Sequence, residues 1–145
     1  MDFSKHIIIN AIFGSLILFI IGEPVFSRNL LIIVLTGLLI DIDHVLDALI
    51  KGELKHPKKL IKHWISTGNK YVKGKYVFHT IEFIILILIL SFAWPKLIYV
   101  FIGLAIHLIA DCMNNYLNTN DFLWLKDYSL CFWKKEKILN REIKK

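Results

Sequence analysis

The sequence predicts an all-α polytopic membrane protein, with four short transmembrane helices in a bundle, a basic cytoplasmic loop and an aromatic C-terminal tail. Two observations lead to this prediction. Hydrophobic residues make up 56% of the 145 residues and charged residues only 21%. The charges are also segregated, because the lysines gather in blocks between or after long apolar runs. Such a composition is typical of a membrane protein with several spans rather than of a small soluble domain.

Four apolar runs are the expected helices. In chain order they cover residues 7–22, 29–50, 81–94 and 97–112. Most are somewhat shorter than the roughly 20 residues that cross a bilayer core. The third run has no polar stripe, and a chain of this size cannot surround such a helix with a core of its own. Lipid is therefore expected around the bundle.

Positive charges orient the predicted helices. The central loop, 51–78, holds eight lysines against the single acidic residue Glu53, and the tail, 113–145, holds seven Lys and Arg residues. The other two turns hold one cation each, Arg28 and Lys96. Cytoplasmic loops of inner-membrane proteins are enriched in cations, so the N-terminus, the loop and the tail are expected in the cytoplasm. The chain is therefore expected to consist of a membrane domain, 1–112, and a cytoplasmic or interfacial tail, 113–145.

The lysines also bear on partners. They lie next to the apolar runs, where they meet anionic headgroups, and they are not interleaved along one amphipathic face. Membrane lipids are therefore the expected partners, and no nucleic acid is expected. The aromatic tail suits the membrane interface, where Trp and Tyr are favoured.

Ionisable residues inside the apolar runs point to function, because carboxylates are costly to bury in lipid. On the predicted topology each helix brings such residues to its cytoplasmic end. In chain order they are His6, then Asp41, Asp43, His44 and Asp47, then His79 and Glu82, and finally His107 and Asp111. Without a cation, a cluster of this kind would repel itself in a low dielectric. The pattern therefore predicts a metal site.

Helical spacing supports the convergence. At about 100° per residue, the acidic set 41–47 falls within an arc of roughly 160° of one helix. His107 and Asp111 are spaced i,i+4, and His79 and Glu82 i,i+3, so each pair shares a face. Helix bundles build carboxylate–histidine metal sites from such pairs. His6 taken alone is better explained by a place in the interior or at the interface than by a ligand role.

The donor types indicate which metals to expect. Mixed imidazole and carboxylate ligands suit divalent zinc, manganese or iron. Cys112 and Cys131 form no thiolate pair of the kind found in structural zinc sites. More donors are present than one ion uses, which favours a binuclear catalytic site, with zinc or manganese preferred. Asp47 and Glu82 are candidates for catalytic bases, with ligand and outer-shell roles also open to them.

Four segments resemble the signatures of a family of small membrane-bound metal-dependent hydrolases, described as LexA-binding and inner-membrane-associated. They are HIIINAIFGSLI, LLIDIDHVLD, FHTIEF and GLAIHLIADCMN, in the family's order. The resemblance implies metal ligands at His6, Asp41, Asp43, His44, His79, His107 and Asp111. The chain departs from the family at Ile40, where a proline usually stands. It also has KGKYVF in place of an Arg-Gly segment before the third signature.

These observations favour a membrane-embedded metal-dependent hydrolase that acts on an ester or phosphoester at the cytoplasmic leaflet. Its substrate would be a lipid or lipid-linked molecule, with Asp47 or Glu82 as general base. Two alternatives stay open. Intramembrane Asp and His also mark divalent metal transporters, although the outer helix halves have few polar residues. The second alternative is a membrane scaffold that bound metals stabilise.

Overall fold

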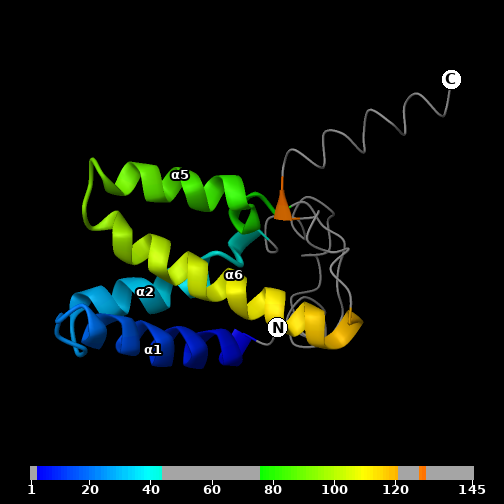
Figure 1. Ribbon diagram of the computed structural model, residues 1–145, viewed down its shortest axis with the longest axis horizontal. Helices are drawn as coiled ribbons and strands as arrows, with labels where there is room; N and C mark the ends of the chain where they lie inside the picture. Colours follow the sequence, from blue (N-terminus) through cyan, green and yellow to red (C-terminus); the bar gives the residue numbers. More distant parts are fainter. Residues whose placement is uncertain (1–2, 44–75, 121–127, 130–145) are drawn as a thin grey trace, which may run out of the picture.

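The computed structural model describes residues 3–43, 76–120 and 128–129, and over these residues it contains helices and no strand (Figure 1). The expected all-α class is confirmed for this part of the chain. The elements are α1 (Phe3–Ile20), α2 (Arg28–Leu39), the 3-10 helix η2 (Val77–His79), α5 (Ile81–Ser91) and α6 (Leu97–Thr119). Among them only α6 is long and apolar enough to cross a membrane by itself, over Leu97–Asn118.

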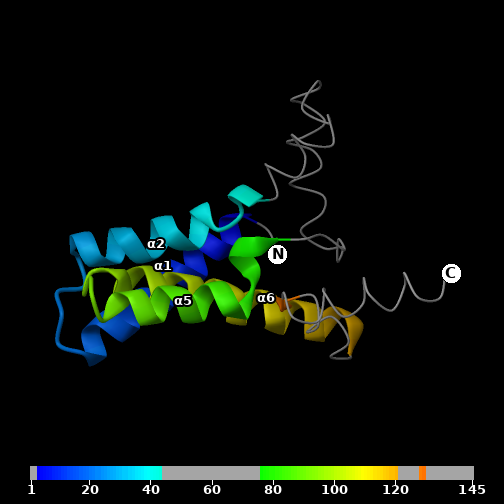
Figure 2. The same ribbon diagram turned by 90° about the horizontal axis from the view of Figure 1, so that it is seen from above.

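The helices run alternately in opposite directions along one axis (Figures 1 and 2). α6 packs against α1, α2 and α5, and α1 also packs against α2. Short connections, 21–27 and 92–96, join the helices at one end. The start of α1, the end of α2 and the start of α5 lie at the opposite end, beside the C-terminal half of α6. The polar residues of four distant segments therefore meet at that end.

Local sequence explains the ends that matter for the site. The hydroxyl of Thr80 accepts from the backbone N–H of Phe83 at 3.4 Å, so it caps the start of α5 directly after η2. Asn120 adopts the left-handed conformation, with φ of 54°, and its N–H bonds to the Tyr116 carbonyl. This is a common way for an α-helix to end.

The interior is small and the outer surface is apolar. Leu18, Ile33 and Ile106 form one buried cluster. A second cluster consists of Ile40, Ile84 and Leu104. By contrast Phe26 and Phe92, on the two short connections, are 98% and 84% exposed, and large apolar side chains lie exposed along every α-helix. Apolar exposure on this scale is typical of a surface that contacts lipid.

The structure changes two details of the sequence prediction. α2 ends at Leu39, with Ile40 and Asp41 in a turn before the helical pair Ile42–Asp43. A continuous helix over 29–50 is therefore wrong, because the chain turns at Ile40 and Asp41. The Gly37 carbonyl, in the last turn of α2, accepts from a side chain of α6 at this break.

The second difference lies at the other end of the chain. α6 continues to Thr119, so residues 113–119, which the sequence assigned to the tail, are helical. Most of the basic loop and of the tail, together with His44 and Asp47, lies outside the described residues.

Candidate metal centre

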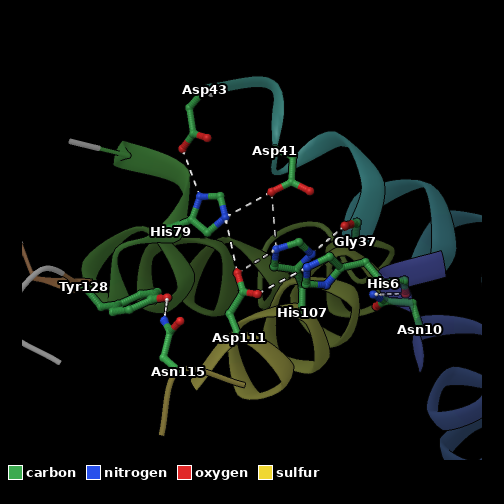
Figure 3. Close-up of polar contacts among 10 residues, drawn as sticks. All are labelled: His6, Asn10, Gly37, Asp41, Asp43, His79, His107, Asp111, Asn115 and Tyr128. Atoms are coloured by element: carbon green, nitrogen blue, oxygen red, sulfur yellow. Dashed lines mark hydrogen bonds and ion pairs between the residues drawn. The ribbon is translucent and has the colours of Figure 1, made fainter. Parts of the chain in front are cut away.

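Side chains from α1, the turn after α2, η2 and α6 converge on one buried cluster (Figure 3). α1 supplies His6 and η2 supplies His79, whereas α6 supplies both His107 and Asp111, one helical turn apart. The residues from the end of α2 are Asp41 and Asp43. His107 is fully buried, and His6 and His79 are nearly so. The convergence expected from sequence is therefore present for six of the predicted residues.

Two ring nitrogens and two carboxylate oxygens form the centre of this group, and we call them the four-atom cluster. They are His79 Nε2, His107 Nε2, Asp41 Oδ1 and Asp111 Oδ2 (Figure 3). Asp41 Oδ1 lies 3.3 Å from the His79 nitrogen and 3.5 Å from the His107 nitrogen. Asp111 Oδ2 lies 3.9 Å and 3.4 Å from the same two atoms. Nitrogen and oxygen alternate around the cluster.

The outer nitrogen of each of these two rings has its own partner. His107 Nδ1 lies 2.7 Å from the Gly37 carbonyl oxygen, and His79 Nδ1 lies 3.1 Å from Asp43 Oδ2. A carbonyl oxygen can only accept, so the His107 proton sits on Nδ1 and the lone pair of Nε2 faces the aspartates. Histidines that bind metals are oriented by contacts of this kind.

His6 extends the cluster on the α1 side. Its ring stacks on that of His107, with the centroids 3.8 Å apart and the planes 10° from parallel. Its Nε2 lies 3.2 Å from Asp111 Oδ1, whereas Asp111 Oδ2 faces the other two histidines. Asp111 therefore presents one oxygen to each side. Donor atoms of His6, Asp41 and His107 also lie within 4.8 Å of one another.

The electrostatics of His79 are set by its neighbours. Burial by itself lowers the pKa of the imidazole, but contacts with Asp41 and Asp43 outweigh burial and raise this pKa to about 9. His79 precedes α5 and belongs to none of the apolar helices. In the metal-free protein it therefore carries a proton at neutral pH, and a cation that binds its Nε2 displaces that proton.

The remaining predicted residues are placed as follows. Asp43 lies on the outer edge of His79, away from the four-atom cluster (Figure 3). Glu82 lies in the first turn of α5, where its Oε1 accepts from Ser129 Oγ at 2.5 Å. His44 and Asp47 fall outside the described residues.

Sequence reasoning missed two residues of the site, Asn10 and Gly37. Asn10 is buried one helical turn after His6, and Gly37 provides the carbonyl for His107. A signal existed for Asn10, because its i,i+4 spacing places it on the same helix face as His6. No pattern marks Gly37, since its role depends on a contact with α6.

The fold and the site together define a helical membrane protein with a buried histidine–aspartate centre. The chain belongs to the YdjM inner membrane protein family, whose sequence model matches residues 1–124. This match includes all the residues of the centre and supports the expected place in the inner membrane. No curated protein and no solved structure matches the chain.

Proposed function

We propose that this protein is a membrane-embedded hydrolase that depends on two divalent ions, zinc or manganese. Its substrate is an ester or phosphoester of a lipid or lipid-linked molecule at the cytoplasmic leaflet. The observation that supports this most is the spacing within the four-atom cluster.

An ion bonded at about 2.0–2.1 Å to tetrahedral nitrogen and oxygen ligands sets neighbouring ligand atoms about 3.3 Å apart. Three of the four nitrogen–oxygen separations in the four-atom cluster are 3.3, 3.4 and 3.5 Å, and the fourth is 3.9 Å. Charge-assisted hydrogen bonds between such groups are shorter, about 2.7–2.9 Å. The spacing thus suits ligands around a cation better than groups that share a proton.

Asp111 supports a second ion. Its two oxygens face different imidazoles, with Oδ1 toward His6 and Oδ2 toward His79 and His107. A carboxylate that faces donors on both sides is suited to contact one ion with each oxygen. We assign His6 to the second ion, together with Asp41, one of whose oxygens lies within 4.8 Å of a ring nitrogen of His6.

The remaining groups have roles around this centre. Bound ions of this type supply Lewis acidity to hydrolytic reactions. Asp43 holds the outer nitrogen of His79, and we assign it to positioning rather than to direct ligation. We assign Glu82 as general base, because it lies three residues after His79 and its Oε1 accepts a hydrogen bond from Ser129. Asp47 is a second candidate for the same role.

The membrane arrangement is part of the proposal. α6 has the length of a complete span, whereas α2 and α5, with 12 and 11 residues, rise only about 18 and 17 Å. All four helices nevertheless expose large apolar side chains, among them Phe19, Leu35, Ile89 and Ile109. We therefore assign four spans, with both termini in the cytoplasm, as the distribution of lysines indicates.

The test begins with metal analysis of the full chain purified in detergent. Two equivalents of zinc or manganese are expected, and hydrolysis of phosphomonoester, phosphodiester or carboxylic ester lipids should be lost when the metal is removed. The absence of stoichiometric metal from folded protein would overturn the proposal. Uptake of metal into vesicles without any hydrolysis would favour a transporter instead. Cysteines placed at Phe26 and Phe92 should react with impermeant reagents from the periplasmic side.

A further inference from the structure

We propose that Asn10 is a positioning residue of the centre. It orients His6 through its side-chain oxygen and supports His107 through its contact with Gly37. This inference rests on the proposed metal site, but it concerns two residues outside the ligand set.

The first step is the burial of an amide in an apolar helix. Asn10 is completely buried within α1, one turn after His6, and its Nδ2 donates to the His6 carbonyl at 3.0 Å. Its Oδ1 is buried and accepts no hydrogen bond from any described residue. A buried polar atom without a partner costs about 1–3 kcal/mol, which indicates a role for this amide.

The second step is a complementary atom on the same helix face. His6 Nδ1 is also buried and has no hydrogen-bond partner in the described part of the chain. An imidazole N–H and an amide oxygen at i and i+4 share one helix face, where one buried water can join them. Such a pair places the His6 proton on Nδ1 and leaves the lone pair of Nε2 directed at Asp111. His107 has the same arrangement through its contact with Gly37.

The third step connects Asn10 to His107. A Cβ atom added at Gly37 would lie 2.2 Å from Asn10 Nδ2, 2.4 Å from its Cγ and 2.6 Å from its Oδ1. The amide therefore occupies the space that the glycine leaves open. The carbonyl of that same glycine accepts from His107 Nδ1 at 2.7 Å (Figure 3). Asn10 thus packs against the group that orients His107, while the ring of His107 stacks on His6.

The experiment uses the full chain in detergent or nanodiscs and compares Asn10→Ala, Asn10→Leu and the matched α1 control Ser15→Ala. Zinc affinity is measured by competition, ligand geometry by the visible spectrum of the cobalt-substituted protein, and histidine tautomers by ¹⁵N NMR of the metal-free protein. Both Asn10 variants should bind zinc about 10–100-fold more weakly, with an altered cobalt spectrum. His6 should also lose its single tautomer. Leu keeps the side-chain volume, so its effect isolates the amide from packing.

A double variant tests the contact with Gly37. Gly37→Ala alone should lower the yield of folded protein, because the methyl group collides with the Asn10 amide. Asn10→Ala combined with Gly37→Ala should recover the folded yield but not the zinc affinity. Recovery of both would show that Asn10 acts only through packing and would overturn its positioning role.

Two results separate this inference from the proposed function. Wild-type zinc affinity, cobalt spectrum and His6 tautomer in Asn10→Leu would overturn the role of Asn10 and leave the metal site intact. A wild-type protein that binds no metal would overturn the proposed function. The tautomer of His6 in the metal-free variants would still decide the role of Asn10.

Discussion

His107 Nδ1 lies 2.7 Å from the carbonyl oxygen of Gly37, a residue 70 positions earlier in the chain. Since the carbonyl can only accept, this contact decides which nitrogen of the ring faces Asp41 and Asp111. The same contact joins the last turn of α2 to the middle of α6, next to the histidine–aspartate centre. The metal-competent atoms are thus arranged by backbone packing as well as by side chains.

Asp111 faces all three histidines, so its loss should affect metal binding most. Asp111→Asn keeps the size of the side chain but removes the charge and one acceptor oxygen. We expect at least a 100-fold loss of zinc affinity, measured by competition with a chelator, and less than stoichiometric metal after purification. Asn118→Ala, at an exposed position of the same helix, is the control and should bind metal as wild type does. Full metal content in Asp111→Asn would contradict the assignment of the bridging ligand.

Asp43 should behave differently, because it contacts the outer nitrogen of His79 at 3.1 Å. Asp43→Asn retains an acceptor oxygen for the His79 N–H, and we expect it to lose about 10-fold in zinc affinity. Asp43→Ala removes the acceptor and should lose about 100-fold. Equal and complete loss of metal in both variants, measured by elemental analysis, would indicate that Asp43 is a direct ligand.

The stability of the metal-free protein should depend on pH through His79. Its pKa in the folded state, about 9, is higher than the ordinary value of 6.5. The stabilisation is therefore complete below pH 6.5 and is lost as the pH rises through about 9, by up to about 3 kcal/mol. Metal affinity should change in the opposite sense, because the cation displaces this proton. Thermal unfolding between pH 6 and pH 10 measures the stability of the metal-free protein, and the added stability with zinc reports metal affinity. In His79→Gln the stability of the metal-free protein should no longer depend on pH in this range.

Glu82 can be separated from the ligands by its effect on turnover. Glu82→Gln should leave the metal content unchanged and lower hydrolysis by 100-fold or more, as expected for a general base. The measurement is lipid hydrolysis at saturating zinc. Ser129→Ala removes the hydrogen bond to Glu82 Oε1 and should have a smaller effect on the rate. A Glu82→Gln variant with full activity would shift the role of base to Asp47.

Gly103 tests the packing that holds the centre together. A Cβ atom there would lie 2.5 Å from the backbone oxygen of Ile33, so Gly103→Ala should push α6 away from α2. We expect a loss of about 1–3 kcal/mol in the free energy of unfolding, measured by denaturant titration in detergent. Gly22→Ala meets no atom within 4 Å but has φ of 77°, so it should show the smaller cost of backbone strain.

The sequence predicted which residues of the centre meet, because each apolar run has its ionisable residues toward the same end. His107 and Asp111 are confirmed as neighbours on one helix face, and His6 and His79 join them from other helices. Composition also predicted the helical class and a membrane protein, in agreement with the inner membrane protein family that the chain matches. These features follow from local patterns and from the cost of charge in lipid.

The details that periodicity could not predict depend on contacts between helices. The break in α2 after Leu39 coincides with a bond from Gly37 to α6, and a pattern along one helix does not report such a bond. The same holds for Asp43, which a helical arc placed with the ligands but which lies behind His79. The proposed part of Asn10 likewise depends on the space that Gly37, on another helix, leaves for its amide.

The stacked rings of His6 and His107 belong to the first and the last helix of the described chain. During synthesis, Asp41 and Asp43 are therefore made long before His107 and Asp111 exist. The proposed ions would therefore find their full ligand set only after α6 has been translated. On this proposal the centre matures late, and a chain truncated before residue 107 should be released without stoichiometric metal.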